Sequence, residues 1–270
     1  MNPLLRLTGV GKRYGGGAPV LAQVDLTVPA GRVIGVLGAN GSGKSTLLRI
    51  MAGVSRATEG AVAGHPAIGY LPDRFPGGQR LSARSYLRHL ARIRGLSDLS
   101  VIDPLLARLG LVGDPDAQLR TLSKGNAQKV GLAQAVFAEP ELLILDEPWS
   151  GLDAGTHAIL GELVAETRER DASVVFTDHR PAIVRQHADD VYRLDSGRLI
   201  AFPDHPETTR IRLSGASSPG HAWADEPGVR TVADEAGCVV LTVEADSADA
   251  VLLRALSGGW SVREVAPCSP

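Results

Sequence analysis

One short segment, residues 38–46, constrains the fold of this chain more than any other part of the sequence. It reads Gly-Ala-Asn-Gly-Ser-Gly-Lys-Ser-Thr and matches the pattern G-x-x-x-x-G-K-[ST]. Glycines allow backbone N–H groups to curl around a polyphosphate, whereas larger side chains would intervene. An apolar run at 33–37 precedes the segment, and helix-forming residues follow from 44 onward. This strand–loop–helix order predicts a phosphate site at a helix N-terminus.

Two polar side chains of this loop have expected roles in holding a nucleoside triphosphate. Lys44 would reach the β- and γ-phosphates, and the Ser45 hydroxyl would bind Mg²⁺. The residues that we expect to contact the nucleotide from this loop are Gly38, Asn40, Gly41, Ser42, Gly43, Lys44, Ser45 and Thr46.

The bulk properties exclude several classes of protein. The net charge of this 270-residue chain is −2, which offers no broad basic surface, so we expect no nucleic-acid partner. Its cysteines, Cys238 and Cys268, form no C-x-x-C motif, so we expect no zinc site. Residues 1–8 lack the apolar region of a signal peptide, and no stretch approaches the roughly 18 apolar residues of a membrane span. We therefore expect any membrane-spanning part to be a separate chain.

Apolar runs of strand length alternate with helical patterns between residues 33 and 194. The runs are at 33–37, 68–71, 142–145, 174–177 and 191–194, and the helical patterns are at 44–52, 156–170 and 181–187. Such alternation predicts an α/β fold with a parallel sheet. Segments 4–8 and 21–28 alternate apolar and polar residues, and we expect them to form an antiparallel addition at the edge of that sheet.

Two other regions depart from this alternation. Residues 81–138 carry helical patterns without a strand signal, which indicates a helical subdomain inserted into the α/β domain of residues 1–203. After residue 203, strand patterns near 211–213, 238–244 and 260–265 surround a helical pattern at 247–256. We therefore expect residues 204–270 to form a small α+β accessory domain, with a regulatory or dimerising role or none beyond that of a folded tail.

A pair of acids ends the apolar run at 142–145. Asp146 follows the run directly, where a carboxylate can hold Mg²⁺, and Glu147 comes next, where it can polarise an attacking water. The alternative is a solvated turn with no chemical role. The phosphate-binding loop upstream favours the chemical interpretation.

A further motif makes the resemblance to a known family specific. Leu122-Ser123-Lys124-Gly125-Asn126 opens a helical pattern and resembles the L-S-G-G-Q signature of ATP-binding cassette (ABC) ATPases, with Lys and Asn at two positions. The chain is similar to the ATP-binding subunits of bacterial exporter-like ABC transporters. This resemblance implies a P-loop NTPase core with a parallel sheet, an antiparallel β edge, a helical signature subdomain and a small α+β appendage.

The resemblance also implies roles for residues outside the loop. Residues 150–153, Ser-Gly-Leu-Asp, match the D-loop, so Asp153 would lie at the subunit interface. His179 matches the switch histidine that contacts the γ-phosphate, and Tyr14 lies where family members stack an aromatic ring on adenine. Where the family has a glutamine, this chain has Asp73, which is either a ligand of Mg²⁺ or a plain loop acid. The stretch 53–73 is shorter than usual, so the antiparallel region should be trimmed.

The resemblance to this family implies a head-to-tail dimer, formed by two copies of this chain or by one copy and a paralogous ATPase. Ser123 and Gly125 of one copy would cap the ATP held by Lys44 of the other, and Glu147 would activate water. The expected partner is an integral membrane permease, with the ATPase at the cytoplasmic face of the membrane. The alternative is a soluble ABC-type ATPase that acts outside transport. A GTP-dependent switch is disfavoured because the chain lacks an N-K-x-D segment.

Overall fold

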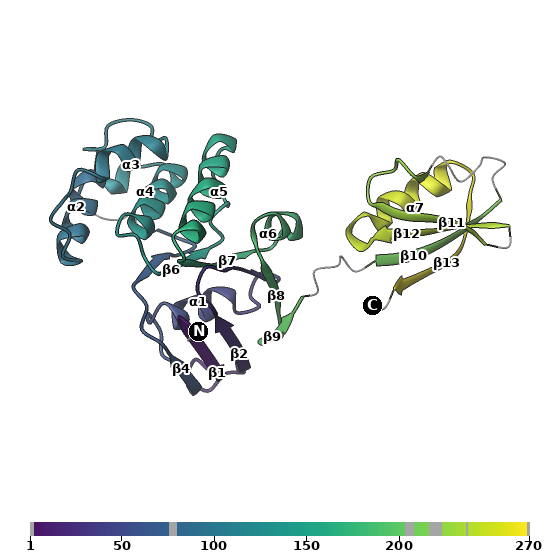
Figure 1. Ribbon diagram of the computed structural model, residues 1–270, viewed down its shortest axis with the longest axis horizontal. Helices are drawn as coiled ribbons and strands as arrows, with labels where there is room; N and C mark the ends of the chain where they lie inside the picture. Colours follow the sequence, from purple (N-terminus) through teal and green to yellow (C-terminus); the bar gives the residue numbers. More distant parts are fainter. Residues whose placement is uncertain (1–2, 76–79, 203–207, 216–222, 236, 269–270) are drawn as a thin grey trace. The chain divides into compact units, whose positions relative to one another are not determined.

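The computed structural model describes residues 3–75, 80–202, 208–215, 223–235 and 237–268. The chain divides into two compact units, Met1–Phe202 and Pro203–Pro270. Each unit has its own buried core, and the two are described separately below (Figure 1).

A largely parallel sheet forms the centre of the first unit. Its strand order is β5 (Ile68–Leu71), β6 (Leu142–Asp146), β7 (Ser173–Asp178), β3 (Val33–Leu37), β8 (Asp190–Asp195) and β9 (Arg198–Ala201), with only β9 antiparallel to its neighbour. All five predicted apolar runs are strands of this sheet, so the predicted α/β fold with a parallel sheet is confirmed. The strands β3, β6 and β7 are almost entirely buried because helices or a second sheet cover both faces.

The register of these strands brings their carboxyl ends to one edge. Leu37 pairs with Asp178, and Asp146 pairs with Thr177. The predicted helices follow as α1 (Lys44–Met51), α5 (Ala154–Glu169) and α6 (Pro181–His187). The loops that carry the phosphate motif, the acid pair and His179 therefore meet at the same edge of the sheet, as the carboxyl ends of parallel strands must.

The N-terminal strands form a sheet of their own, in the order β2 (Leu21–Val28), β1 (Leu5–Lys12) and β4 (Glu59–Ala63). The prediction that they extend the edge of the parallel sheet is wrong in this detail. Their apolar side chains instead face a second core that includes Leu47 and Leu48 of α1 and Ile144 of β6. Face-to-face packing buries every second side chain of β2, which edge pairing would leave exposed. The short strand β4 was not predicted because all five of its residues are exposed and carry no apolar alternation.

The helical region contains α2 (Ala83–Ile93), α3 (Ile102–Arg108), the 3₁₀ turn η1 (Leu119–Thr121) and α4 (Lys124–Val136). Figure 1 shows α2, α3 and α4 grouped together, apart from β1, β2 and β4. Ala83, Leu87 and Ala91 lie one turn apart on α2 and are buried. Arg84 pairs with both Asp103 and Asp116, which ties the start of α2 to α3 and to the loop after it.

The second unit is a four-stranded antiparallel sheet with one long helix. The strand order is β11 (Val229–Glu235), β12 (Cys238–Glu244), β10 (Thr208–Ser214) and β13 (Ser261–Cys268). A 3₁₀ turn, η3 (Ala245–Ser247), leads into α7 (Ala248–Ser257). Trp223 and Trp260 meet edge to face in its core. The edge strand β11 was not predicted, because most of its side chains are exposed.

The close approach of α4 to β5 predicts that Gly69 tolerates no side chain. A Cβ at Gly69 would lie 2.0 Å from the Ala135 carbonyl oxygen and 2.8 Å from Pro140 Cγ. Gly69→Ala should lower the free energy of unfolding by about 1–3 kcal/mol, because backbone rather than a flexible side chain must move. Denaturant titration measures this. Gly16→Ala, whose new Cβ has no described neighbour within 4 Å, is the matched control and should change stability little.

Candidate nucleotide-binding site

The loop before α1 has a conformation that only glycine allows at several positions. A Cβ at Gly38 would lie 2.6 Å from Ser42 Oγ and 2.8 Å from the Leu194 carbonyl oxygen. Gly41 and Gly43 have φ angles of 83° and 106°, in the left-handed region that disfavours residues with a Cβ. Gly43 is also the N-cap of α1, so the loop leads directly into a helix N-terminus. The backbone thus forms the cradle that the sequence pattern predicts.

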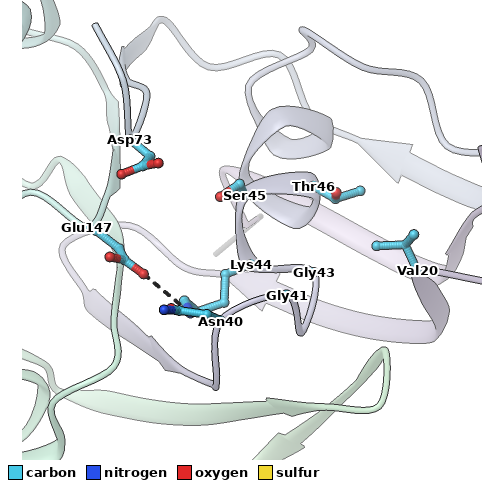
Figure 2. A pocket seen from close by; sticks show the side chains of 9 residues that line it. All are labelled: Val20, Asn40, Gly41, Gly43, Lys44, Ser45, Thr46, Asp73 and Glu147. Carbon is cyan, nitrogen blue, oxygen red and sulfur yellow. Dashed lines mark ion pairs between the residues drawn. The ribbon is translucent and has the colours of Figure 1, made fainter.

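Lys44 lies over this loop and is almost fully buried. Its ammonium Nζ donates hydrogen bonds to the carbonyl oxygens of Gly38 at 2.7 Å and Ala39 at 3.2 Å. The same Nζ is 3.4 Å from Glu147 Oε1, and Figure 2 shows the two side chains pointing toward one another. The pocket is lined by Val20, Asn40, Gly41, Gly43, Lys44, Ser45, Thr46, Asp73 and Glu147.

Asp146 ends β6 with a fully buried carboxylate. Its Oδ1 accepts a hydrogen bond from Thr177 Oγ1 at 2.8 Å, whereas Oδ2 has no hydrogen-bond partner among the described residues. Burial raises the pKa of Asp146, and hydrogen bonding to Ser45 and Thr177 opposes that rise. A buried carboxylate oxygen without a partner, next to a serine hydroxyl, fits Mg²⁺, which takes hard oxygen ligands.

Glu147 is held in an unusual backbone conformation beside Asp146. Its φ is 47°, in the left-handed region, and its N–H donates to Thr177 Oγ1 at 3.0 Å. Thr177 therefore positions both acids, as an acceptor for Glu147 and a donor to Asp146. Sequence reasoning missed Thr177 because a hydroxyl at the end of a buried strand carries no recognisable signal.

His179 follows β7 and approaches the same carboxylate. Its Nδ1 is 3.8 Å from Glu147 Oε2 and 3.7 Å from Asp178 Oδ1. Asp178 is buried, and Arg180 binds it through Nε at 2.9 Å and Nη2 at 2.8 Å. Burial alone would raise the pKa of Asp178, but the hydrogen bonds and charge of Arg180 outweigh burial and hold the pKa below its usual value. Buried Asp178 and its partner Arg180 thus flank His179 on both sides in the sequence.

Three other residues lie around the pocket in different ways. Asp73 lines it from the segment after β5, on the side of Glu147 (Figure 2). Val20 lines it too but was not predicted, because an isolated apolar residue before β2 carries no motif. The Tyr14 side chain is 51% exposed and does not line the pocket, although its hydroxyl interacts with Thr46 of α1.

The remaining predicted residues lie outside this pocket. Ser123 is the N-cap of α4, and its Oγ accepts a hydrogen bond from the Asn126 N–H at 3.2 Å. A Cβ at Gly125 would lie 3.4 Å from the Gly151 carbonyl oxygen, so the signature segment borders the loop after β6. Asp153 caps α5 and pairs with the buried Lys129 of α4 at 3.0 Å. Hydrogen bonds from Thr156 and Lys129 lower the pKa of Asp153.

This arrangement defines a class of protein: a P-loop fold in which a lysine, a buried strand-end aspartate, a glutamate and a histidine surround a phosphate cradle. The comparisons with known proteins agree. The family model for ABC transporter matches residues 21–150. The zinc import ATP-binding protein ZnuC of Paramagnetospirillum magneticum is 40% identical over 210 residues, covering 76% of this chain and 78% of that protein.

A further relative points to the same family, and a solved structure shows the same fold. The uncharacterized ABC transporter ATP-binding protein YhaQ of Bacillus subtilis is 34% identical, covering 66% of this chain and 63% of that protein. A solved structure, the ATP-binding cassette MJ0796 in a dimeric post-hydrolysis state with ADP and Pi, has a TM-score of 0.68 at 22% identity, covering 74% of this chain and 99% of that one. The chain belongs to the ABC transporter family as an ATP-binding subunit, and it is an ATPase.

The double role of Thr177 predicts a measurable loss of stability when its hydroxyl is removed. Thr177→Val keeps the volume but leaves the Glu147 N–H and Asp146 Oδ1 without their partner. We expect the free energy of unfolding to fall by about 1–3 kcal/mol. Denaturant titration measures it. Thr167→Val is the control, because the buried Thr167 hydroxyl donates to the Leu163 carbonyl oxygen of its own helix and to no other group among the described residues. Equal losses in the two variants would contradict the role given to Thr177.

Proposed function

We propose that this subunit powers a membrane transporter by ATP-driven closure of a head-to-tail dimer. One observation carries the proposal: the expected nucleotide contacts fall into two groups. Lys44, Glu147 and their neighbours line one pocket, whereas Ser123 and Gly125 lie outside it. A second copy, or a paralogous ATPase, supplies the missing contacts if its signature segment faces this pocket.

In this proposal each side chain at the pocket has a separate task. Lys44 and His179 bind the γ-phosphate, and Glu147 orients and polarises the attacking water. Ser45 and Asp146 would hold Mg²⁺, which would neutralise charge on the phosphates, and Asp73, which lines the pocket, would assist. Tyr14 borders α1 through Thr46, beside the loop, where it can pack against adenine. Ser123, Gly125 and Asp153 act at the dimer interface.

The partner in this proposal is an integral membrane permease, with this subunit peripheral at the cytoplasmic face of the membrane. Among the described residues, no helix is long and apolar enough to cross a bilayer, which fits a permease encoded as a separate chain. Export stays a sequence-based prediction. The similar ZnuC is an import protein by name, so the cassette alone gives no support for one direction.

The second candidate function is a soluble ABC-type ATPase that acts outside transport. Copurification separates the two: recovery of a polytopic membrane protein with the tagged subunit from detergent extracts supports transport. A partner set of soluble proteins alone supports the second function.

Replacing the proposed base should separate binding from hydrolysis. Glu147→Gln removes the carboxylate that would accept the proton of water, so we expect hydrolysis to fall by about 10²–10⁴-fold while ATP still binds. The ATP-loaded variant should accumulate as a dimer in size-exclusion chromatography with light scattering. Adding Ser123→Arg in that background should leave a monomer with ATP bound. Steady turnover near the wild-type rate in Glu147→Gln would rule out the base, and a persistent dimer in the double variant would rule out the shared site.

The accessory domain is proposed to regulate the ATPase or to strengthen the dimer. The first unit has buried cores of its own, so residues 1–202 should keep their melting temperature when expressed alone. In that truncated chain we expect the ATPase rate or the monomer–dimer equilibrium to change by at least about tenfold, a typical allosteric coupling. Unchanged values of both would identify the domain as a folded tail.

A further inference from the structure

The backbone at Glu147 is strained, and something must hold it there. A φ of 47° is disfavoured for any residue with a Cβ, and such conformations persist only where the surroundings impose them. Pro148 also disfavours the right-handed helical alternative for the residue before it. A tight turn starts at this point, since the Ser150 N–H donates to the Glu147 carbonyl oxygen at 3.0 Å. The contacts that hold the residues after Glu147 in this turn therefore set the direction of the Glu147 carboxylate.

The Trp149 side chain is one part of that anchor. Its indole is 2% exposed and meets Phe176 of β7 edge to face, with ring centres 4.9 Å apart. On its other side it stacks on His187 of α6, with ring centres 4.8 Å apart and an angle of 17° between the planes. Burial lowers the pKa of His187 and so favours the neutral form of the stacked imidazole. The indole cannot shift without opening the core between β7 and α6.

The Trp149 backbone is fixed by a separate contact. His157, in the first turn of α5, donates from Nε2 to the Trp149 carbonyl oxygen at 2.9 Å, which requires the tautomer with hydrogen on Nε2. One turn later, a Cβ at Gly161 would lie 3.1 Å from His187 Cε1, so this glycine allows α5 to pack against the same imidazole. Ring and carbonyl of one residue are therefore both held, two positions after Glu147.

We propose that the His157–Trp149 contact locks the strained turn at Glu147, which makes His157 a positioning residue for ATP hydrolysis. The lock keeps the Glu147 carboxylate 3.4 Å from Lys44 Nζ and 3.8 Å from His179 Nδ1. It also links the Glu147 turn to the segment that carries His179, because Phe176 precedes His179 in the chain and α6 follows it. The role of His157 in hydrolysis rests on the proposed function of Glu147. The claim that the contact holds the strained backbone does not.

Comparing glycine with alanine at position 147 measures the strain without the carboxylate. Both variants lack the charge, so their difference in melting temperature reports the backbone alone. With His157 intact, we expect Glu147→Gly to melt about 2–4 °C above Glu147→Ala, because glycine adopts positive φ freely. In a His157→Phe background, which keeps a ring but lacks the N–H donor, the turn relaxes. The difference should then vanish or reverse.

The controls decide between the lock and other causes. His89→Phe, at an exposed histidine of α2, should leave the glycine–alanine difference at its original size. His157→Leu removes the same donor with a smaller side chain and replaces His157→Phe if that variant does not fold. A glycine–alanine difference that stays the same without His157 overturns the proposal, and it would assign the strain to Thr177 and Pro148 instead.

A kinetic measurement tests the catalytic consequence. His157→Phe with Glu147 intact should lower kcat by about 10²-fold, the typical effect of a small misplacement of a catalytic group. The Kd for a non-hydrolysable ATP analogue should stay within about twofold of wild type, since the phosphate cradle is untouched. Normal turnover in Glu147→Gln would defeat the proposed function but leave the strain result standing. An unchanged kcat in His157→Phe would defeat the positioning role.

Discussion

The pairing of β6 with β7, and of β7 with β3, is the constraint on which the site depends. It places Asp146 beside Thr177 and Leu37 beside Asp178, so three loops open at one edge of the sheet. Within that frame a single hydroxyl, that of Thr177, receives the Glu147 N–H and donates to Asp146. A register slip of one residue would turn each of these side chains to the other face. Backbone hydrogen bonds between these strands thus align the phosphate-binding loop with Asp146 and Glu147 before any ligand binds.

The parts that could be predicted from sequence were those with strong local signals. The buried runs around β3, β6 and β7 are apolar on both faces, and the glycines before Lys44 have no other physical reason to cluster. These local patterns predict the α/β fold and single out Lys44 and Glu147, which line the pocket, and Asp146, which ends β6 next to Glu147. The resemblance added His179, which the structure places beside Glu147.

The parts that could not be predicted depend on contacts between distant segments. Strands β1 and β2 form a separate sheet, rather than an edge of the parallel sheet, because they pack on α1 and β6. No local sequence pattern encodes this packing. Strands β4 and β11 are held by their neighbours and have mostly exposed side chains. Thr177, Val20, His157 and Trp149 belong to no sequence motif. The fold alone places them at or beside the site.

The ion pair between Lys129 and Asp153 has a mechanical consequence. Asp153 caps α5, and Lys129 belongs to α4, so one carboxylate joins the helical region to the segment that follows Glu147. Lys129 is 5% exposed, and a buried ammonium without a counter-charge is costly. A rotation of the helical region would therefore either break this ion pair or carry the loop at 150–153 with it. This charged contact would thus couple a movement of α4 to the loop that follows Glu147.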